Sequence, residues 1–157
     1  MLKILEVNSE TLIQQAYDTF KEYSNYLNID LEFQDFEQEL NNLPEEYKPP
    51  HGCILLAFYN NALAGCVALR KFKDKICEMK RLHVKSEYRG RDIGKKLAEL
   101  VIEKAREMGY KSMRLDTLHF IKEAISLYLS LGFKEIEAYR SNPFDGAKFF
   151  QLELQNI

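Results

Sequence analysis

The sequence has no tryptophan, only seven glycines and four prolines among 157 residues, and no long apolar run. A bilayer-spanning helix needs about 18 or more consecutive apolar residues, so no membrane partner is expected. The opening MLKILEVNSE carries charges at Lys3 and Glu6 and therefore lacks the apolar region of a signal peptide. We expect a cytoplasmic protein.

Cysteine is also scarce, with Cys53, Cys66 and Cys77 widely spaced and odd in number. They form no C-x-x-C pair and no disulfide framework, and each lies in an apolar run, which is typical of small core residues. No histidine, cysteine or carboxylate cluster has the spacing of metal ligands. We therefore predict three buried thiols and no metal.

The length and the charge distribution limit the organisation of the chain. A chain of 157 residues, 46% apolar and 29% charged, predicts one globular domain over residues 1–157. The net charge of -2 conceals 11 acidic and 3 basic residues in 1–60, against 13 acidic and 19 basic residues in 61–157. This asymmetry suggests an anionic partner for the basic half, although halves of a sequence are not surface patches.

The hydrophobic pattern predicts a mixed α/β domain. Asn8 or Ser9 could cap a first helix, residues 24–50 hold a second apolar pattern of helical spacing, and LPEEYKPPHG (43–52) is predicted as a loop. Asn60-Asn61 predicts a hairpin turn. The expected strands are 2–7, 53–59, 62–72, 75–84, 112–118, 134–140 and 147–154, and the later helices are 93–108 and 122–131. This order gives an antiparallel N-terminal meander followed by one β-α-β crossover.

The stretch SEYRGRDIGKKLAELVIEKAREMG (86–109) places a basic, glycine-containing turn at the start of an amphipathic helix. A helix N-terminus has unpaired N–H groups and about half a positive charge, which suit a phosphate or pyrophosphate. A solvated, arginine-rich turn before a surface helix is the simpler alternative. The basic residues around the turn are Arg89, Arg91, Lys95 and Lys96, with Asp92 as the one acid among them.

This turn resembles motif A of the GNAT superfamily, the Gcn5-related N-acetyltransferases, whose pattern is [RQ]-x-x-G-x-[GA]. Here it reads Arg89-Gly90-Arg91-Asp92-Ile93-Gly94, with aspartate in place of the middle glycine. AISLYLSLGF (124–133) resembles the family's second signature, A-x-x-L-Y-x-x-x-G-F. The resemblance covers about residues 52–154 and implies a mixed seven-stranded sheet flanked by about four helices.

The resemblance implies acetyl-CoA as co-substrate, with its pantetheine arm between two splayed parallel strands. Amides of the turn would hold the pyrophosphate, and Asp92 could instead cap the helix. Ile121 stands where many members have an asparagine, a contact that Thr117 could replace. The implied cofactor-binding residues are Leu82, His83, Val84, Arg89, Gly90, Arg91, Asp92, Ile93, Gly94, Lys95 and Thr117.

The same resemblance assigns catalytic roles. Tyr128 would be the general acid that protonates the departing CoA thiolate, and a backbone N–H near Val84 would stabilise the oxyanion. Glu78 is the predicted general base, because strand alternation places it on one face with Val84 and places His83 on the opposite face. Glu78 could instead pair with a surface cation. His83 and His119 are further candidates for the base.

The acceptor is expected to be a primary amine on a small molecule or peptide, which direct attack on the thioester would acetylate. Residues 22–47 contain eight acids and no lysine or arginine, so they could attract a cationic acceptor, although a solvated acidic face is the simpler explanation. A turn at 142–146 could wall the acceptor site. A homodimer is compatible with the sequence. The alternative function is a non-catalytic acyl-CoA-binding module; no RNA-binding aromatic motif appears, so no nucleic acid partner is expected.

Overall fold

The structure is a computed structural model that describes residues 1–27, 36–142 and 146–154. The strands are β1 (Leu2–Glu6), β2 (Cys53–Tyr59), β3 (Ala62–Lys73), β4 (Ile76–Val84), β5 (Ser112–Leu118), β6 (Lys134–Ile136) and β7 (Ala147–Glu153). The helices are α1 (Glu10–Leu27), α2 (Phe36–Asn41), α3 (Leu43–Glu46), α4 (Ile93–Glu107) and α5 (Lys122–Ser130), with a short 3-10 helix, η2 (Ser86–Tyr88).

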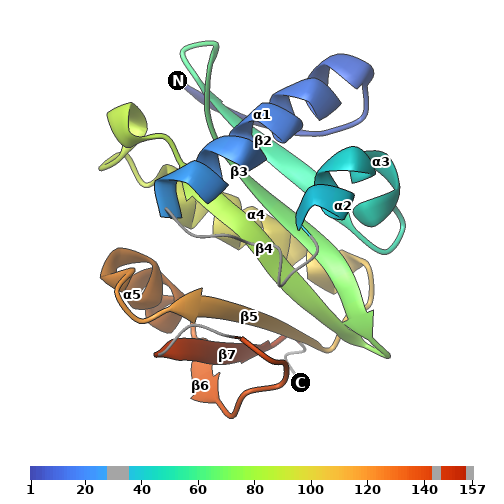
Figure 1. The fold of residues 1–157 in the computed structure, drawn as a ribbon, viewed down its shortest axis with the longest axis vertical. Coiled ribbons are helices and arrows are strands. Elements are labelled where there is room, and N and C mark those ends of the chain that lie inside the picture. The colour runs from blue at the N-terminus through green and yellow to red at the C-terminus, as the bar shows by residue number, and fades with distance from the viewer. Residues whose placement is uncertain (28–35, 143–145, 155–157) are drawn as a thin grey trace.

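All seven strands form one mixed sheet in the order β1-β2-β3-β4-β5-β7-β6, which confirms the predicted fold class (Figure 1). β1 to β4 are an antiparallel meander, and β4 pairs in parallel with β5. α4 makes the connection between these two strands, which is the predicted β-α-β crossover. β5, β7 and β6 continue the sheet with antiparallel pairing.

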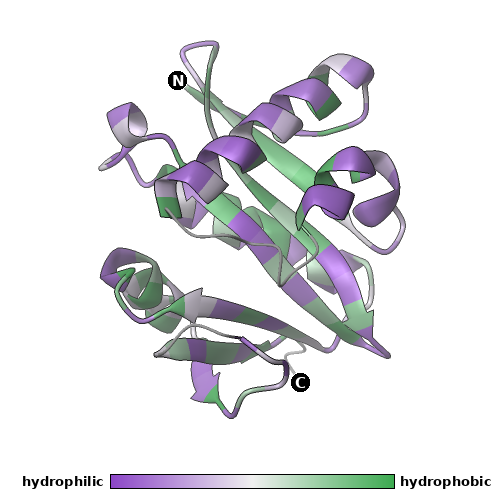
Figure 2. Cartoon of the chain, viewed as in Figure 1, coloured by the Kyte–Doolittle hydropathy of each residue, from purple (hydrophilic) through white to green (hydrophobic). Residues whose placement is uncertain are grey.

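Helices cover both faces of the sheet. α4 and α5 pack on one face, where Leu97, Val101 and Ala105 of α4 are fully buried. α1, α2 and α3 cover the other face through residues such as Ala16 and Phe20. Because β2 and β3 are covered on both sides, they are almost continuously apolar at their centres. Figure 2 shows hydrophilic residues along β3 and β4 beneath α1–α3, where an ordinary core would be apolar.

Local signals in the sequence account for several element boundaries. Ser9 Oγ accepts a hydrogen bond from the N–H of Leu12 at 3.3 Å, which caps α1. Asn60 and Asn61 both have positive φ, 49° and 71°, as the predicted hairpin turn requires. The three cysteines are buried and free, as predicted.

Three of the expected element assignments need correction. The segment 43–52, predicted as a loop, begins with α3, because Pro44 is tolerated in the first turn of a helix. The strand expected over 134–140 ends at Ile136. In the second expected helical region, residues 28–35 lie outside the described residues, and the described part forms α2 and α3 rather than one helix.

A bulge in β4 changes which side chains share a face. Arg81 has a φ of +62°, and the pairing with β3 shifts there: Ala68 is opposite Lys80, but Cys66 is opposite His83. β4 therefore contains one extra residue, which reverses the alternation beyond it.

The bulge overturns the predicted orientation of the side chains of β4. Glu78 is opposite Arg70 and His83 is opposite Cys66, so both face α1–α3. Val84 packs with the core on the α4 face. The expectation that Glu78 and Val84 share a face, with His83 opposite, is therefore wrong, because simple alternation does not hold across a bulge.

Candidate active site

β4 and β5 separate along most of their length. Their parallel pairing runs only from Ile76 and Ser112 to Glu78 and Arg114. Beyond these residues β4 continues to Val84 and β5 to Leu118, with no pairing between them. The two strands therefore open into a seam whose backbone edges are available to a third, extended group.

A cavity of about 300 Å³, which we call the turn cavity, occupies the open end of this seam. Its wall combines the end of α1, the end of β4, the turn before α4, and α5. Ten of the eleven predicted cofactor-binding residues line it, and the predicted acid Tyr128 lines it as well. The ten are Leu82, His83, Val84, Arg89, Gly90, Asp92, Ile93, Gly94, Lys95 and Thr117.

The turn before α4 offers a run of unpaired backbone amides. The N–H of Arg89 is donated to the carbonyl of Ser86, and that of Lys96 to the carbonyl of Asp92. Between them, within the described part of the chain, the amides of 90–95 donate to no backbone carbonyl. Gly90 has a φ of +81°, a conformation that glycine adopts without strain and that turns successive amides toward one point. The turn therefore fits a pyrophosphate.

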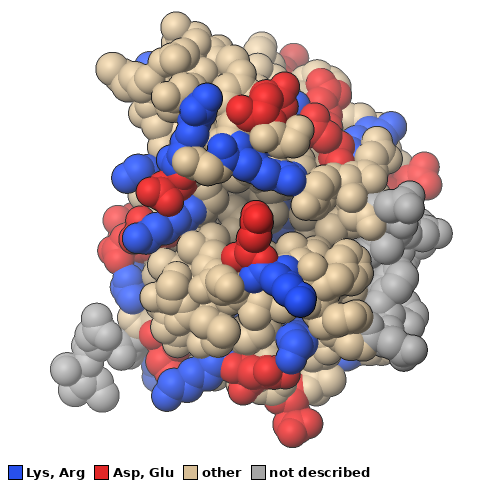
Figure 3. All heavy atoms as spheres, turned by 90° about the vertical axis from the view of Figure 1, so that its left-hand side faces the viewer, with Lys and Arg blue, Asp and Glu red and all other residues tan. Residues whose placement is uncertain are grey.

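Cations surround these amides without being neutralised. Arg89 stacks on Tyr26 of α1 at 4.3 Å from the ring centre, and its Nε donates to the carbonyl of Val84 at 3.1 Å. Arg91, the predicted residue outside the cavity lining, stacks on Tyr59 at 4.9 Å. Among the described residues, neither they nor Lys95 and Lys96 form an ion pair. Figure 3 shows several basic side chains on the face that holds this turn, with acidic side chains among them.

Asp92 occupies the N-cap position of α4 but makes no side-chain capping hydrogen bond. Its φ of +61° is left-handed, which aspartate tolerates better than most residues but glycine adopts freely. The expectation that Asp92 caps the helix is therefore wrong. The middle glycine of the motif is explained by this backbone angle.

Tyr128 lies where the turn cavity meets a second, small cavity of about 50 Å³, which we call the seam cavity. The seam cavity is lined on the α1–α3 side by Lys80, Asp116 and Asn142, among others. Tyr128 is 7% exposed and packs against Phe133 and Phe150, and no described group is hydrogen-bonded to its hydroxyl. Burial raises its pKa well above 10, so the hydroxyl is protonated at neutral pH.

His83 belongs to a cluster of polar side chains at the wall of the turn cavity. Its Nε2 lies 2.9 Å from Oε2 of Glu22, and Lys85 Nζ donates to the other oxygen of that carboxylate at 2.9 Å. Tyr23 and Tyr26 of α1 pack against the imidazole. Burial lowers the pKa of His83 despite the neighbouring carboxylate, which keeps the ring neutral at pH 7.

Glu78 lies outside both cavities. It is 1% exposed and accepts hydrogen bonds from Arg70 Nε at 3.3 Å, from the Tyr139 hydroxyl at 2.9 Å and from Arg140. Arg70 also contacts Glu46 of α3 at 2.5 Å. The structure thus places the predicted base in a buried ion-pair network. Glu78 is two residues before Lys80, which lines the seam cavity. The assignment of Glu78 as the base stays a prediction.

The structure also places three other positions that the sequence analysis named. Thr117 lines both the turn cavity and the seam cavity, as a residue replacing the missing asparagine contact would. Ile121, at the start of α5, lines both cavities as well and packs partly against the α1–α3 core. His119 packs against Phe120 and lines neither cavity.

The acidic segment 22–47 is largely neutralised by contacts within the protein. Of its five described acids, Glu22, Glu39, Glu45 and Glu46 pair with cations, and Glu39 makes a two-pronged contact with the buried Arg81 at 3.0 and 2.7 Å. Acidic residues of α1–α3 thus pair with basic residues of the sheet, and this pairing accounts for part of the charge asymmetry of the sequence. The five described acids therefore offer little unpaired charge to a cationic acceptor, and Asp30, Glu32 and Asp35 of the same segment lie outside the described residues.

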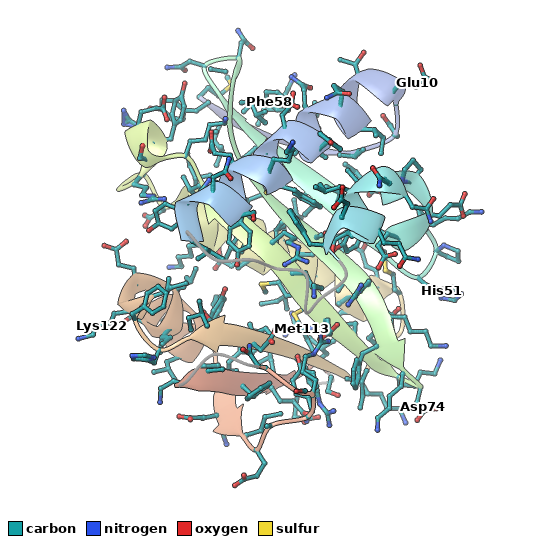
Figure 4. The ribbon with its side chains drawn as sticks, viewed as in Figure 1. Glu10, His51, Phe58, Asp74, Met113 and Lys122 are labelled. Atoms are coloured by element: carbon teal, nitrogen blue, oxygen red, sulfur yellow. The ribbon has the colours of Figure 1, made fainter. Side chains whose placement is uncertain are left out.

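Sequence reasoning missed the contribution of α1 and the buried ion pairs. Tyr23 follows Phe20 by three residues and Leu27 follows Tyr23 by four, which continues the apolar spacing of the helix. This signal could have placed the end of α1 over the site. Lys80-Arg81 in the middle of a predicted strand was a second signal, because adjacent cations inside a sheet need partners. Figure 4, in which Met113 marks the paired start of β5 and Lys122 the start of α5, shows side chains from α1 and α5 on either side of the seam.

Among the described residues, no three histidine, cysteine, aspartate or glutamate side chains lie together in a group that could hold a metal ion. Within those same ranges, no helix combines the length and apolar character needed to cross a membrane.

Comparisons with known proteins agree with this geometry. The acetyltransferase (GNAT) family profile matches residues 13–133. An uncharacterised N-acetyltransferase of Schizosaccharomyces pombe is 40% identical over 152 residues, which are 93% of each chain. A GNAT acetyltransferase from Staphylococcus aureus superposes with a TM-score of 0.82 at 24% identity, covering 99% of this chain and 100% of that one. An acetyltransferase from Salmonella typhimurium, solved with acetyl-CoA, has a TM-score of 0.70 at 16% identity, covering 99% and 95%.

Proposed function

Because the chain belongs to the acetyltransferase (GNAT) family, we propose that it transfers the acetyl group of acetyl-CoA to a primary amine at the seam between β4 and β5. One observation carries the proposal: the unpaired amides at 90–95 and Tyr128 line a single cavity at the open end of that seam. The acetyl-CoA in the Salmonella structure, which has the same fold, supports this choice of co-substrate.

The turn would bind the pyrophosphate, and the open edge of β4 would bind the pantetheine arm. Amides at 90–95 supply the donors, and the uncompensated charges of Arg89 and Lys95 add attraction without the cost of breaking an existing ion pair. Backbone groups at Leu82 to Val84 have no β5 partner, so they can pair with the amides of the pantetheine arm. A backbone N–H in this segment would stabilise the oxyanion.

Tyr128 would assist the departure of the thiolate. As the amine nitrogen bonds to the acetyl carbon, the carbon–sulfur bond breaks, and the phenol shares its proton with the sulfur. A thiol has a pKa of about 8.5, and each unit of mismatch costs about 1.4 kcal/mol. Because burial raises the pKa of Tyr128, complete transfer is costlier than for an ordinary phenol, and a hydrogen bond to the developing thiolate is favoured over complete transfer.

For the proton of the amine, the contacts favour His83 over the predicted Glu78. His83 lines the same cavity as Tyr128 and is neutral at pH 7, whereas the Glu78 carboxylate is occupied by three donors. If Nε2–H is donated to Glu22, Nδ1 remains as the acceptor. The His83→Gln variant should lose activity while Glu78→Gln keeps kcat; the reverse result would restore Glu78 as the base.

Calorimetric titration with acetyl-CoA, followed by thiol release across a panel of amines, tests the proposed function. We expect binding to the purified protein and turnover with some member of the panel. Absence of acetyl-CoA binding at millimolar concentration would overturn the proposal. Binding without turnover on small amines or peptides would instead favour a non-catalytic acyl-CoA-binding protein.

A further inference from the structure

A third hollow adjoins the seam on the α1–α3 side of the sheet. This basic groove, of about 810 Å³, is lined by residues of β3 and β4, the segment after α3, and Arg140. Glu78, at its floor, is two residues before Lys80, which lines the seam cavity. Both face α1–α3, and two residues of strand span roughly 7 Å. The groove therefore begins about 7 Å along β4 from Lys80, which lines the seam cavity together with Tyr128.

Arg140 is incompletely satisfied in this groove. Its Nη2 contacts Glu78, but its buried Nε has no hydrogen-bond partner among the described residues. Its guanidinium lies against Phe72 and Tyr139, at 5.8 and 5.3 Å from their ring centres. Burial, together with the nearby positive charge of Arg70, lowers its pKa to about 10. Arg140 therefore shares its one carboxylate partner among the described residues, Glu78, with Arg70.

The groove as a whole carries more positive than negative side chains. Glu78 is shared by Arg70 and Arg140, and Arg70 also serves Glu46, so two carboxylates face two guanidinium groups in this network. The rest of the lining has one carboxylate, Glu45, which pairs with Lys48, and one further cation, the exposed Lys71. Guanidinium groups bind carboxylates through paired hydrogen bonds, and Arg140 retains donors for such a contact. A carboxylate-bearing ligand suits this arrangement, and a second cation does not.

We propose that the acceptor amine also carries a carboxylate, which Arg140 and Arg70 hold in the basic groove while the amine reaches the seam beside Tyr128. This inference rests on the proposed acetyl transfer and specifies its acceptor class. Glu78 then acts as a positioning residue, because it fixes both guanidinium groups. The short separation of groove and seam selects a compact amino acid in which a few bonds separate the amine from the carboxylate.

An isosteric series of acceptors tests the proposal. 4-Aminobutyrate, 4-aminobutanamide, butylamine and 1,4-diaminobutane offer the same primary amine with a carboxylate, an amide, a methyl group or a second ammonium at the far end. Thiol release should show a kcat/KM at least about tenfold higher for 4-aminobutyrate than for its amide, a modest value for a charged hydrogen bond. Equal rates, or preference for the diamine, would overturn the proposal.

Arg140 variants separate recognition from chemistry. Arg140→Gln should raise KM for 4-aminobutyrate about tenfold and leave its kcat and the kinetics of the amide unchanged, and Arg140→Lys should recover part of the loss. Lys134→Gln, an exposed lysine of β6 that does not line the groove, is the control and should change neither substrate. Equal effects of Arg140→Gln on both substrates would contradict a carboxylate contact.

A binding measurement keeps the test independent of turnover. Calorimetry of 4-aminobutyrate with the CoA-saturated protein should give a signal that Arg140→Gln removes and Lys134→Gln retains. Failure of 4-aminobutyrate to bind, while other amines are acetylated, overturns the inference and leaves the acetyltransferase function standing. Failure of acetyl-CoA itself to bind is the separate outcome that removes the proposed function.

Discussion

The sheet face under α1–α3 and the turn before α4 both contain clustered arginine and lysine. The two clusters differ in whether their cations are paired with carboxylates. On the sheet face, Arg70, Arg81 and Arg140 each contact at least one carboxylate, and Arg81 is only 5% exposed. In the turn, Arg89 and Arg91 stack on tyrosine rings and, among the described residues, meet no carboxylate.

This difference separates charges that hold the fold from charges kept for a ligand. Taking a cation out of water costs several kcal/mol unless a partner compensates it, so the buried arginines must be paired. The turn avoids that cost because its cations stay near the surface, where solvent screens them. A ligand phosphate can therefore bind there without displacing a carboxylate of the protein. The exception on the sheet face is Arg140, whose Nε has no described partner.

Removing a paired cation should have the largest effect on stability. Arg81→Met leaves Glu39 as a buried carboxylate without its two-pronged partner, and we expect the free energy of unfolding to fall by about 3–5 kcal/mol. Urea denaturation measures it. The matched variant in the turn, Arg91→Met, should change stability by less than about 0.5 kcal/mol.

The double variant Glu39→Leu/Arg81→Met checks the cause of that loss. Replacing both charges with apolar side chains removes the uncompensated carboxylate, so much of the stability should return. If the double variant is as unstable as Arg81→Met, the loss comes from packing rather than from charge. If Arg91→Met is equally destabilising, the contrast between the two regions fails.

Tyr128 lines the cavities on both sides of the seam, so its substitution tests the chemistry at the point where the two regions meet. Tyr128→Phe keeps the ring against Phe133 and Phe150 but removes the hydroxyl. We expect kcat to fall about 100-fold or more while acetyl-CoA affinity is retained, as for a general acid. Steady-state thiol release and calorimetry measure the two quantities. Full activity of this variant would eliminate the proposed role.

Gly94 allows the turn to be blocked without disturbing the sheet face. A Cβ added at Gly94 would meet only Val84 and Leu127 at 3.6 and 3.9 Å, so Gly94→Ala should fold normally and keep its affinity. Gly94→Trp places an indole in the turn cavity, and acetyl-CoA affinity should fall at least about tenfold, or 1.4 kcal/mol. Calorimetry of both variants measures it; equal affinities would place the cofactor elsewhere.

The sequence predicted local features better than contacts between distant segments. The motif at 89–94 located the turn cavity, because its residues are contiguous and their backbone angles are a local property. The Glu39–Arg81 pair joins residues 42 apart, and nothing in the local pattern identifies partners at that separation. The bulge at Arg81 was missed for a related reason: alternation assumes a regular strand, and an extra residue reverses every position beyond it.

Substitutions of Asp92 should have the smallest effect. They test how the charge and the backbone angle at this position affect the turn. Asp92 is the one carboxylate within the motif, and its φ of +61° is better suited to glycine. Asp92→Asn removes the charge and keeps a residue that tolerates the left-handed angle, whereas Asp92→Gly removes the charge and the backbone strain together.

If the carboxylate opposes the pyrophosphate, Asp92→Asn should bind acetyl-CoA about two- to fivefold more tightly, which is less than 1 kcal/mol. Asp92→Gly should add a small gain in unfolding free energy only if the strain exceeds the chain entropy that glycine introduces. Calorimetry at low and at high salt separates these causes, because a charge effect is screened and a backbone effect is not. Unchanged affinity in Asp92→Asn would mean that the side chain points away from the bound phosphates, so the turn tolerates an acid because solvent, rather than ligand, faces it.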